Sequence, residues 1–306
     1  MNMNILITGG SGFIASHVVD ALAGQGHDVV VLDLRPRQYG QNAAGVAFVP
    51  GSFADEVTLG AAIRDHAITH VVHAGWAIPQ TPGGLAQDEQ DNVLPTLRLI
   101  ETCARNAVRR VLFFSSAGVY GVPSHDLVDE THATNPISTY GAAKLTCEKY
   151  LQVARHLHGL EYVIVRPSSV YGPGQDPNRR LGVINIFVNK ALRSQPVTLR
   201  GDGSSLRDYL FISDAASAIA QMTLAEEAAN RVFNLGAERG YTLQELVDEI
   251  AQVLGCQVAI TREPPAKFEI PRMMLDATRL RETLGWQPRV SLREGIAKTA
   301  EWLGEG

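Results

Sequence analysis

Tyr140 and Lys144 are four residues apart in the run STYGAAKLTCEKY. On a helix this spacing puts both side chains on one face, so a phenol lies beside an ammonium. A phenol has an ordinary pKa near ~10, and an adjacent cation favours the phenolate and lowers that value. We interpret the pair as a candidate device for moving a proton on a substrate oxygen. The alternative is a chance pair on a solvated helix face, so the interpretation needs support from the rest of the chain.

A glycine-rich turn near the start of the chain, TGGSGFIASH, is typical of dinucleotide binding. Gly9, Gly12 and Ala15 have the spacing that lets a backbone turn approach a pyrophosphate and lets the next helix pack closely on the strand. The amides and the positive dipole end of that helix would face the same anion.

Asp33 ends the next apolar run, in VVVLDLRPR. A carboxylate at this position can accept hydrogen bonds from ribose hydroxyls and would repel a 2′-phosphate, so NAD is favoured over NADP. Arg35 and Arg37 are close enough in sequence to accommodate that phosphate, and NADP therefore stays open.

The elements that must position these residues follow a regular alternation. Apolar runs of strand length alternate with stretches of helical periodicity, which predicts a doubly wound parallel sheet with helices on both faces. The predicted strands are 4–8, 28–32, 47–49, 70–73, 110–115 and 162–166, and the predicted helices between them are 12–24, 57–65, 88–106 and 140–158.

After Pro167 the pattern loosens into turn-rich sequence such as RPSSVYGPGQDPNRRLG. We predict an α/β fold with a Rossmann-type, NAD-binding domain over residues 1–166, to which 208–235 return. Residues 167–207 and 236–306 are expected to form a smaller α/β substrate-binding lobe.

Composition excludes several classes of function. The formal net charge of the 306 residues is -5, with no polybasic arm, so we expect no nucleic-acid partner. No segment reaches transmembrane length and no leader is evident, which favours a soluble, cytoplasmic protein without a membrane partner. Cys103, Cys147 and Cys256 lack metal-ligand spacing, so we expect neither disulfides nor a metal site.

Further motifs occur in a fixed order along the chain: VVHAGWA, NVLPTLRLIETCA, FFSSAGVYG, RPSSVYGPGQ and SLRDYLF. With TGGSGFIASH and the Tyr140–Lys144 pair, they make the chain resemble the extended short-chain dehydrogenase/reductase superfamily, in its nucleotide-sugar epimerase and dehydratase branch. The resemblance covers nearly the whole chain.

The resemblance implies roles for particular residues. Ser116, Tyr140 and Lys144 would be catalytic: Ser116 bridges the sugar hydroxyl and the tyrosine, Tyr140 is the acid/base, and Lys144 grips the nicotinamide ribose. Ser116 could instead be an ordinary hydroxyl at a strand end. The implied NAD-binding residues are Gly9, Gly12, Phe13, Ile14, Asp33, Ser52, Phe53, Ala74, Gly75, Trp76, Asn92, Tyr140, Lys144 and Pro167. The implied substrate-binding residues are Ser116, Ser169, Arg207 and Arg272.

The chain departs from the family pattern at several of these places. Ala117 and Gly118 stand where dehydratases of the branch carry acids, which disfavours elimination of water. Ser52 stands where an Asp usually holds the adenine amine, and Ser169 replaces a common Asn near the substrate phosphates.

Three side chains, Arg207, His73 and Trp76, have a structural reading beside the functional one. Arg207 is expected to bind a diphosphate, or else to form a surface ion pair with Asp208; either Arg272 or Lys267 would be its partner on the phosphates. We expect His73 to be a structural histidine at a strand end. Trp76 could wall the cofactor pocket or pack in the core.

The resemblance implies an NAD-dependent nucleotide-sugar 4-epimerase that oxidises its substrate, expected to be a UDP-hexose, transiently to a 4-keto sugar. The alternatives are an NAD(P)H-dependent reductase of a nucleotide-linked 4-keto sugar, a dehydrogenase of another small alcohol, and a nucleotide-sensing regulator without chemistry. Helices 88–106 and 140–158 resemble the pair through which the family forms homodimers.

Overall fold

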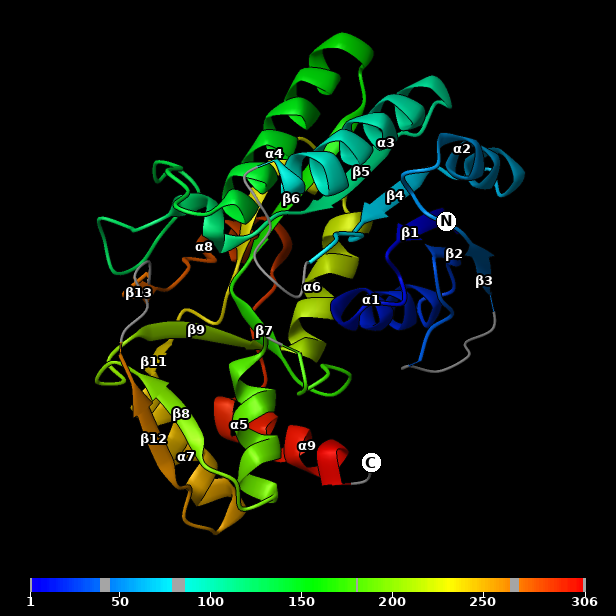
Figure 1. Ribbon diagram of the computed structural model, residues 1–306. Coiled ribbons are helices and arrows are strands. Elements are labelled where there is room, and N and C mark those ends of the chain that lie inside the picture. The colour runs from blue at the N-terminus through cyan, green and yellow to red at the C-terminus, as the bar shows by residue number, and fades with distance from the viewer. Residues whose placement is uncertain (1, 39–44, 79–85, 180, 265–269, 305–306) are drawn as a thin grey trace.

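The computed structural model describes residues 2–38, 45–78, 86–179, 181–264 and 270–304 (Figure 1). Its main sheet has seven parallel strands in the order β10-β6-β5-β4-β1-β2-β3. These strands are β1 (Asn4–Thr8), β2 (Asp28–Asp33), β3 (Val46–Pro50), β4 (His70–His73), β5 (Arg110–Phe114), β6 (Glu161–Pro167) and β10 (Arg231–Leu235). The predicted doubly wound parallel sheet is confirmed.

Helices cover both faces of this sheet because its strands are apolar on both sides. α1 (Phe13–Ala23) and α6 (Ile212–Leu224) pack on one face, whereas α2 (Glu56–Asp65), α3 (Leu94–Arg105) and α4 (Thr139–His158) pack on the other (Figure 1). Successive residues of β1 alternate between the two cores: Ile5 and Ile7 belong to the first, and Leu6 belongs to the second.

The start of α4 is fixed by its sequence. The Ser138 side chain caps the helix by accepting a hydrogen bond from the Gly141 N–H at 3.1 Å. Gly159 ends the helix with φ +72°, a conformation that costs glycine little. This frame places Tyr140 in the first turn and Lys144 one turn further, on the side that packs against β5.

The remaining elements form a smaller α/β part below the main sheet in Figure 1. Its strands are β7 (Ser169–Tyr171), β9 (Leu206–Phe211), β11 (Gly240–Thr242) and β13 (Arg272–Met273) in one sheet, and β8 (Val197–Arg200) paired with β12 (Ile260–Glu263). Its helices are α5 (Val183–Leu192), α7 (Leu243–Leu254) and α9 (Leu292–Gly304), whereas α8 (Thr278–Leu284) packs against β10 of the main sheet. The stretch that forms α6 and β10 lies with the main sheet, and the division into two domains stays a prediction.

One predicted helix differs in its first turns. The stretch expected as a single helix over 88–106 begins with a π-helical turn, η1 (Glu89–Val93), before α3. Pro95 lies at the start of α3 and has no N–H to donate back into the preceding turn, which accounts for the irregular entry. The wider turn contains Asn92, which is almost fully buried.

A buried polar network joins α4, β6 and β10 at the carboxyl end of β5. Glu148 pairs with Arg166 at 2.6 Å and also accepts a hydrogen bond from the Ser115 hydroxyl. Arg166 donates to the Tyr120 oxygen at 2.9 Å, and the Tyr120 hydroxyl donates to Asn234 at 2.7 Å. Because each member has its partner, the network fixes the carboxyl end of β5 against its neighbours.

Within the described parts of the chain, no helix is both long enough and apolar enough to cross a membrane.

Candidate active site

Ser116 and Tyr140 meet just beyond the carboxyl end of β5. Ser116 caps the 3₁₀ turn η2 (Ala117–Tyr120), and its Oγ accepts a hydrogen bond from the Gly118 N–H at 3.1 Å. Burial is the larger effect on Tyr140 and raises its pKa. A hydrogen bond between the Ser116 and Tyr140 side chains opposes this shift in part. The two hydroxyls therefore form one polar unit that faces the adjacent cavity.

Lys144 is fully packed beside them. Its Nζ donates to the Phe114 carbonyl oxygen at 2.6 Å and lies 3.5 Å from the centroid of the Trp76 ring, an arrangement for a cation–π contact. Burial lowers the pKa of Lys144 to about 7, although the charges of nearby Cys147 and Glu148 oppose this shift.

The pKa of Tyr140 is raised overall, because burial outweighs the groups that lower it. Lys144 is not among the causes of this shift, so its predicted lowering of the Tyr140 pKa stays a prediction. The Lys144 ammonium is directed at the Phe114 carbonyl, 5.7 Å from the Tyr140 ring centroid, and its own charge is penalised by burial.

The glycine turn has the close backbone approach that the dinucleotide hypothesis requires. Gly9 has φ +69°, and a Cβ on it would lie 2.5 Å from the Gly75 Cα, so only glycine fits there. Gly12 immediately precedes α1, and Phe13 and Ile14 form the first turn of that helix, partly buried against the core. The Ala74 N–H bonds to the Thr8 carbonyl oxygen at 3.1 Å and holds the segment after β4 beside the turn.

Asp33 ends β2 within reach of the same turn. Its carboxylate accepts hydrogen bonds from the Ser11 N–H at 3.1 Å and the Arg35 N–H at 3.3 Å. Arg37, which sequence reasoning kept open as a ligand for a 2′-phosphate, forms an ion pair with Asp20 at 2.6 Å. Its charge is engaged on α1, so the residues around Asp33 fit the ribose hydroxyls of NAD.

Ser52 and Phe53 lie past the end of β3. The Ser52 Oγ accepts a hydrogen bond from the Ala54 N–H at 3.1 Å, so its side chain stabilises its own turn. The Phe53 ring contacts His73 edge to face at 4.8 Å between centroids. His73 is fully buried, and its two ring nitrogens bond to the Thr8 and Thr96 hydroxyls, which agrees with the structural role expected for it.

Trp76 and Asn92 are two further residues predicted to contact the cofactor. The Asn92 side chain accepts from the Ala77 N–H at 2.7 Å and donates to the Ala77 carbonyl at 3.0 Å, which fixes the segment that carries Trp76. Among the described residues, the buried Trp76 Nε1 has no hydrogen-bond partner. Pro167, the other candidate for cofactor contact, ends β6 opposite Leu235.

A cavity of about 600 Å³ opens next to Ser116 and Tyr140. Three buried polar atoms of its lining, the Ser168 Oγ, the Gln175 Oε1 and the Tyr209 Oη, have no hydrogen-bond partner among the described residues. Buried polar groups are normally satisfied, so these atoms suit a ligand rich in hydroxyls. The described residues that line the cavity are Ala77, Ile78, Asp88, Ser116, Thr139, Tyr140, Ser168, Ser169, Val170, Tyr171, Gln175, Leu181, Gly182, Val183, Ile184 and Tyr209.

Sequence reasoning found three members of this lining, Ser116, Tyr140 and Ser169. It missed Asp88, Ser168, Gln175 and Tyr209, which lie on four different segments. Ser168 lies between the predicted residues Pro167 and Ser169, and Tyr209 lies two residues after Arg207, on the same side of its strand; this closeness in sequence is the signal that could have found them.

Arg207 lies on β9 beside the cavity, where its charge lowers the pKa of Tyr209, although burial raises that pKa overall. Arg272 on β13 is opposite Leu206 in the register, so it faces the other side from Arg207, and its Nε lies 3.3 Å from Asp126. Lys267 lies outside the described residues.

Asp208 does not form the surface ion pair with Arg207 that was the alternative reading. Asp208 is 1% exposed and accepts backbone hydrogen bonds from Ala237 at 2.8 Å and Leu275 at 3.3 Å. Its carboxylate therefore ties β9 to two neighbouring segments, and Arg207, as the adjacent strand residue, points to the opposite face of the sheet.

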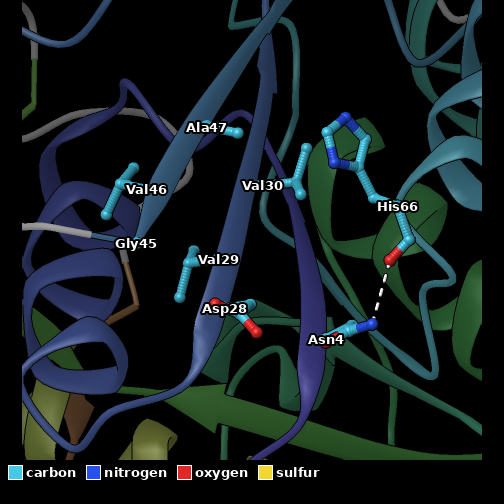
Figure 2. A pocket seen from close by; sticks show the side chains of 8 residues that line it. All are labelled: Asn4, Asp28, Val29, Val30, Gly45, Val46, Ala47 and His66. Atoms are coloured by element: carbon cyan, nitrogen blue, oxygen red, sulfur yellow. Dashed lines mark hydrogen bonds between the residues drawn. The ribbon is translucent and has the colours of Figure 1, made fainter.

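A second hollow, of about 400 Å³, lies at the opposite edge of the main sheet and is shown in Figure 2. It is lined by residues at the amino ends of β1, β2 and β3, where the Asn4 amide donates to the His66 carbonyl oxygen at 3.0 Å. Ligands of open parallel sheets bind at the carboxyl ends of the strands, so this hollow is separate from the candidate active site.

Comparisons with known proteins agree with this geometry. The sequence model of the NAD dependent epimerase/dehydratase family matches residues 5–236. A putative UDP-glucose 4-epimerase of Methanocaldococcus jannaschii is 35% identical over 303 residues, which cover 98% of each chain. The crystal structure of a UDP-glucose 4-epimerase from Thermotoga maritima with UDP-glucose superposes with a TM-score of 0.92 at 34% identity, and that of MoeE5 in complex with UDP-glucuronic acid and NAD with 0.89 at 29%, each over 99% of both chains.

Proposed function

The chain belongs to the NAD-dependent epimerase/dehydratase family, and from that premise we propose that it is a nucleotide-sugar 4-epimerase acting on a UDP-linked hexose. The observation that carries the proposal is the position of the Ser116–Tyr140 unit, which borders both the buried Lys144 and a cavity with unsatisfied polar atoms. One side of this unit would face the cofactor and the other the sugar.

The residues of the first half fit NAD. Gly9, Gly12 and the start of α1 would hold the pyrophosphate, Asp33 the adenosine ribose, and Lys144 the nicotinamide ribose. The close contact of Gly9 with Gly75 is the structural sign of such a cradle. When bound, NAD supplies a reversible hydride acceptor next to the carbinol carbon.

The chain's own residues would handle the proton. Tyr140 takes the proton of the sugar C4 hydroxyl as that carbon becomes a ketone, and returns it after the sugar has presented its other face. Ser116, hydrogen-bonded to Tyr140, would share the same substrate oxygen. On the substrate side, Arg207 and Ser169 would contact the diphosphate, and a role for Arg272 there stays a prediction.

Ala117 and Gly118 argue against loss of water from the ketone. A Cβ on Gly118 would lie 3.4 Å from the Ser116 Oγ, so a side chain at this position would reach the reacting groups. Glycine leaves that place without an acid, and the ketone is expected to be reduced again without elimination.

The test is an assay of purified protein with UDP-glucose carrying deuterium at C4. We expect UDP-galactose that keeps the deuterium at C4, without net consumption of NAD. Tyr140→Phe should lower kcat by about 10²- to 10⁴-fold, the usual contribution of a general acid/base, while NAD binding is retained. Net consumption of NAD(P)H with a 4-keto sugar, and no epimerisation of any UDP-hexose, would instead identify a reductase.

We further propose that the protein works in the cytoplasm as a homodimer formed by α3 and α4. Support comes from the outer face of α4, where Tyr150, Val153 and Leu157 are exposed at helical spacing. The cysteines Cys103, Cys147 and Cys256 are free thiols, as suits a reducing compartment.

A further inference from the structure

Asp88 lies in the lining of the 600 Å³ cavity, just ahead of the π-helical turn η1. Of the described residues that line this cavity, it is the one that carries a formal charge at neutral pH. No role for it follows from the mechanism above, because the proton is handled by Tyr140 and Ser116.

The Asp88 carboxylate is held in place by the Asn92 side chain. The Asn92 amide donates to the Asp88 Oδ1 at 3.1 Å while its other contacts fix the Ala77 backbone. A carboxylate has about four acceptor positions, so this single contact leaves capacity for a ligand. Among the described residues, no cation lies within ion-pair distance of Asp88.

The carboxylate is also close to the reacting groups. Its negative charge acts to raise the pKa of both Tyr140 and Lys144. Asp88 and Tyr140 both line the cavity, so a sugar whose C4 hydroxyl reaches Tyr140 occupies the space that Asp88 borders.

We propose that Asp88 is a specificity-determining residue: it accepts a hydrogen bond from a hydroxyl of a neutral hexose and repels the carboxylate of a uronic acid. The proposal rests on the proposed nucleotide-sugar substrate and deepens it by naming the sugar class. UDP-hexoses that are neutral at the sugar are accepted, and UDP-uronates, which MoeE5 binds, are disfavoured.

Electrostatics gives the size of the effect. Two like charges about 4 to 8 Å apart in a site of intermediate dielectric repel strongly enough to change affinity by roughly 10- to 100-fold. A neutral sugar gains a hydrogen bond to the ionised Asp88, whereas a uronic acid loses affinity through repulsion. The difference in affinity between the two sugars comes from both effects.

The test measures equilibrium affinities of the NAD-loaded protein for UDP-glucose and UDP-glucuronate by isothermal titration calorimetry. We expect the wild type to prefer UDP-glucose by about 10- to 100-fold. Asp88→Asn keeps the shape and the Asn92 contact but removes the charge, and it should narrow the preference to within about threefold by tightening UDP-glucuronate binding.

The matched control is Asp91→Asn, because Asp91 is an exposed carboxylate of the adjoining turn η1 and does not belong to the described cavity lining. This control should keep the wild-type preference, and thermal melts of both variants report whether they fold. A wild type that prefers UDP-glucuronate, or an Asp88→Asn protein that folds and keeps the full preference, would overturn the assignment.

Binding and turnover separate the two proposals. If the preference depends on Asp88 but neither sugar is epimerised, the specificity assignment stands and the 4-epimerase activity fails. If UDP-glucose is epimerised and Asp88→Asn keeps the wild-type preference for UDP-glucose, the epimerase activity stands and the specificity assignment fails. A protein that binds neither UDP-sugar contradicts both.

Discussion

Lys144 is an ammonium buried among a carbonyl oxygen and aromatic rings. Its Nζ lies 3.5 Å from the centroid of Trp76 and 4.9 Å from that of Phe113, besides the bond to the Phe114 oxygen. Aromatic faces stabilise a cation less than water does, so the charged form is costly in the folded protein. Trp76, which sequence reasoning could place in a pocket wall or in the core, here forms one side of this lysine's enclosure.

This burial makes a prediction about stability and pH. The pKa of Lys144 is about 7 in the folded chain and 10.5 ordinarily, so between these values the unfolded chain binds the proton and the folded chain does not. Lys144 should therefore make the cofactor-free protein more stable as pH rises from 7 to 9, by about 2 kcal/mol. Urea denaturation at both pH values measures the change.

The comparison with variants isolates this effect from other titrating groups. Lys144→Met should remove that part of the rise in stability, whereas Lys149→Met, which removes an exposed lysine of the same helix, should leave it in place. Equal pH dependence in the wild type and Lys144→Met would show that the ammonium is not penalised by its surroundings.

At the scale of elements, the glycine turn and the segment after β4 depend on each other through one contact. A Cβ on Gly9 would lie 2.5 Å from the Gly75 Cα at a φ of +69°, so Gly9→Ala must displace backbone. We expect at least tenfold weaker NAD binding and a loss of about 2 kcal/mol or more in stability, measured by titration calorimetry and urea denaturation.

Gly26→Ala is the matched control, because Gly26 also has a positive φ, +82°, but an added Cβ would meet nothing within 4 Å. It should cost about 1 kcal/mol in stability and leave NAD affinity unchanged. If Gly9→Ala and Gly26→Ala behave alike, the contact with Gly75 has no part in cofactor binding.

Six strands of the main sheet, β1 to β6, were predictable because each is a short apolar run bounded by turn residues, and the turn before α1 carries its own spacing signal. The seventh strand, β10, was not among the predicted strands. The cavity was not predictable. Its lining depends on register between distant segments: β9 pairs with β7, β11 and β13, and none of these pairings is encoded locally.

The burial of charged residues is hard to predict for a related reason. Charged side chains are usually exposed, yet Glu148 and Arg166 form a buried pair whose partners lie on different elements. Asp88 stands in the polar run DEQDN, which looks like the solvated start of a helix until the π-helical turn directs Asn92 inward beneath it.

At the scale of the whole molecule, α4 presents apolar side chains that a single chain leaves uncovered. Val153 is 46% exposed and Leu157 is 70% exposed on its outer face. If these residues form the proposed dimer interface, Leu157→Arg should convert the dimer into a monomer at micromolar concentration, because an unpaired charge is costly in an interface core. Sedimentation velocity measures the change.

Val57→Arg supplies the comparison, since Val57 is 79% exposed but lies on α2. It should leave the sedimentation coefficient unchanged. A wild type that sediments as a monomer, or dimers that persist in Leu157→Arg, would contradict an interface at this face.

The strand order of the main sheet also constrains how the chain is made. β10 pairs with β6, yet more than sixty residues, including α5, β8 and β9, are synthesised between them. Until residues 231–235 leave the ribosome, β6 is an unpaired edge strand whose backbone is open to association with other chains. Completion of the main sheet therefore waits for part of the smaller α/β part, and a nascent chain cannot finish the one before it has begun the other.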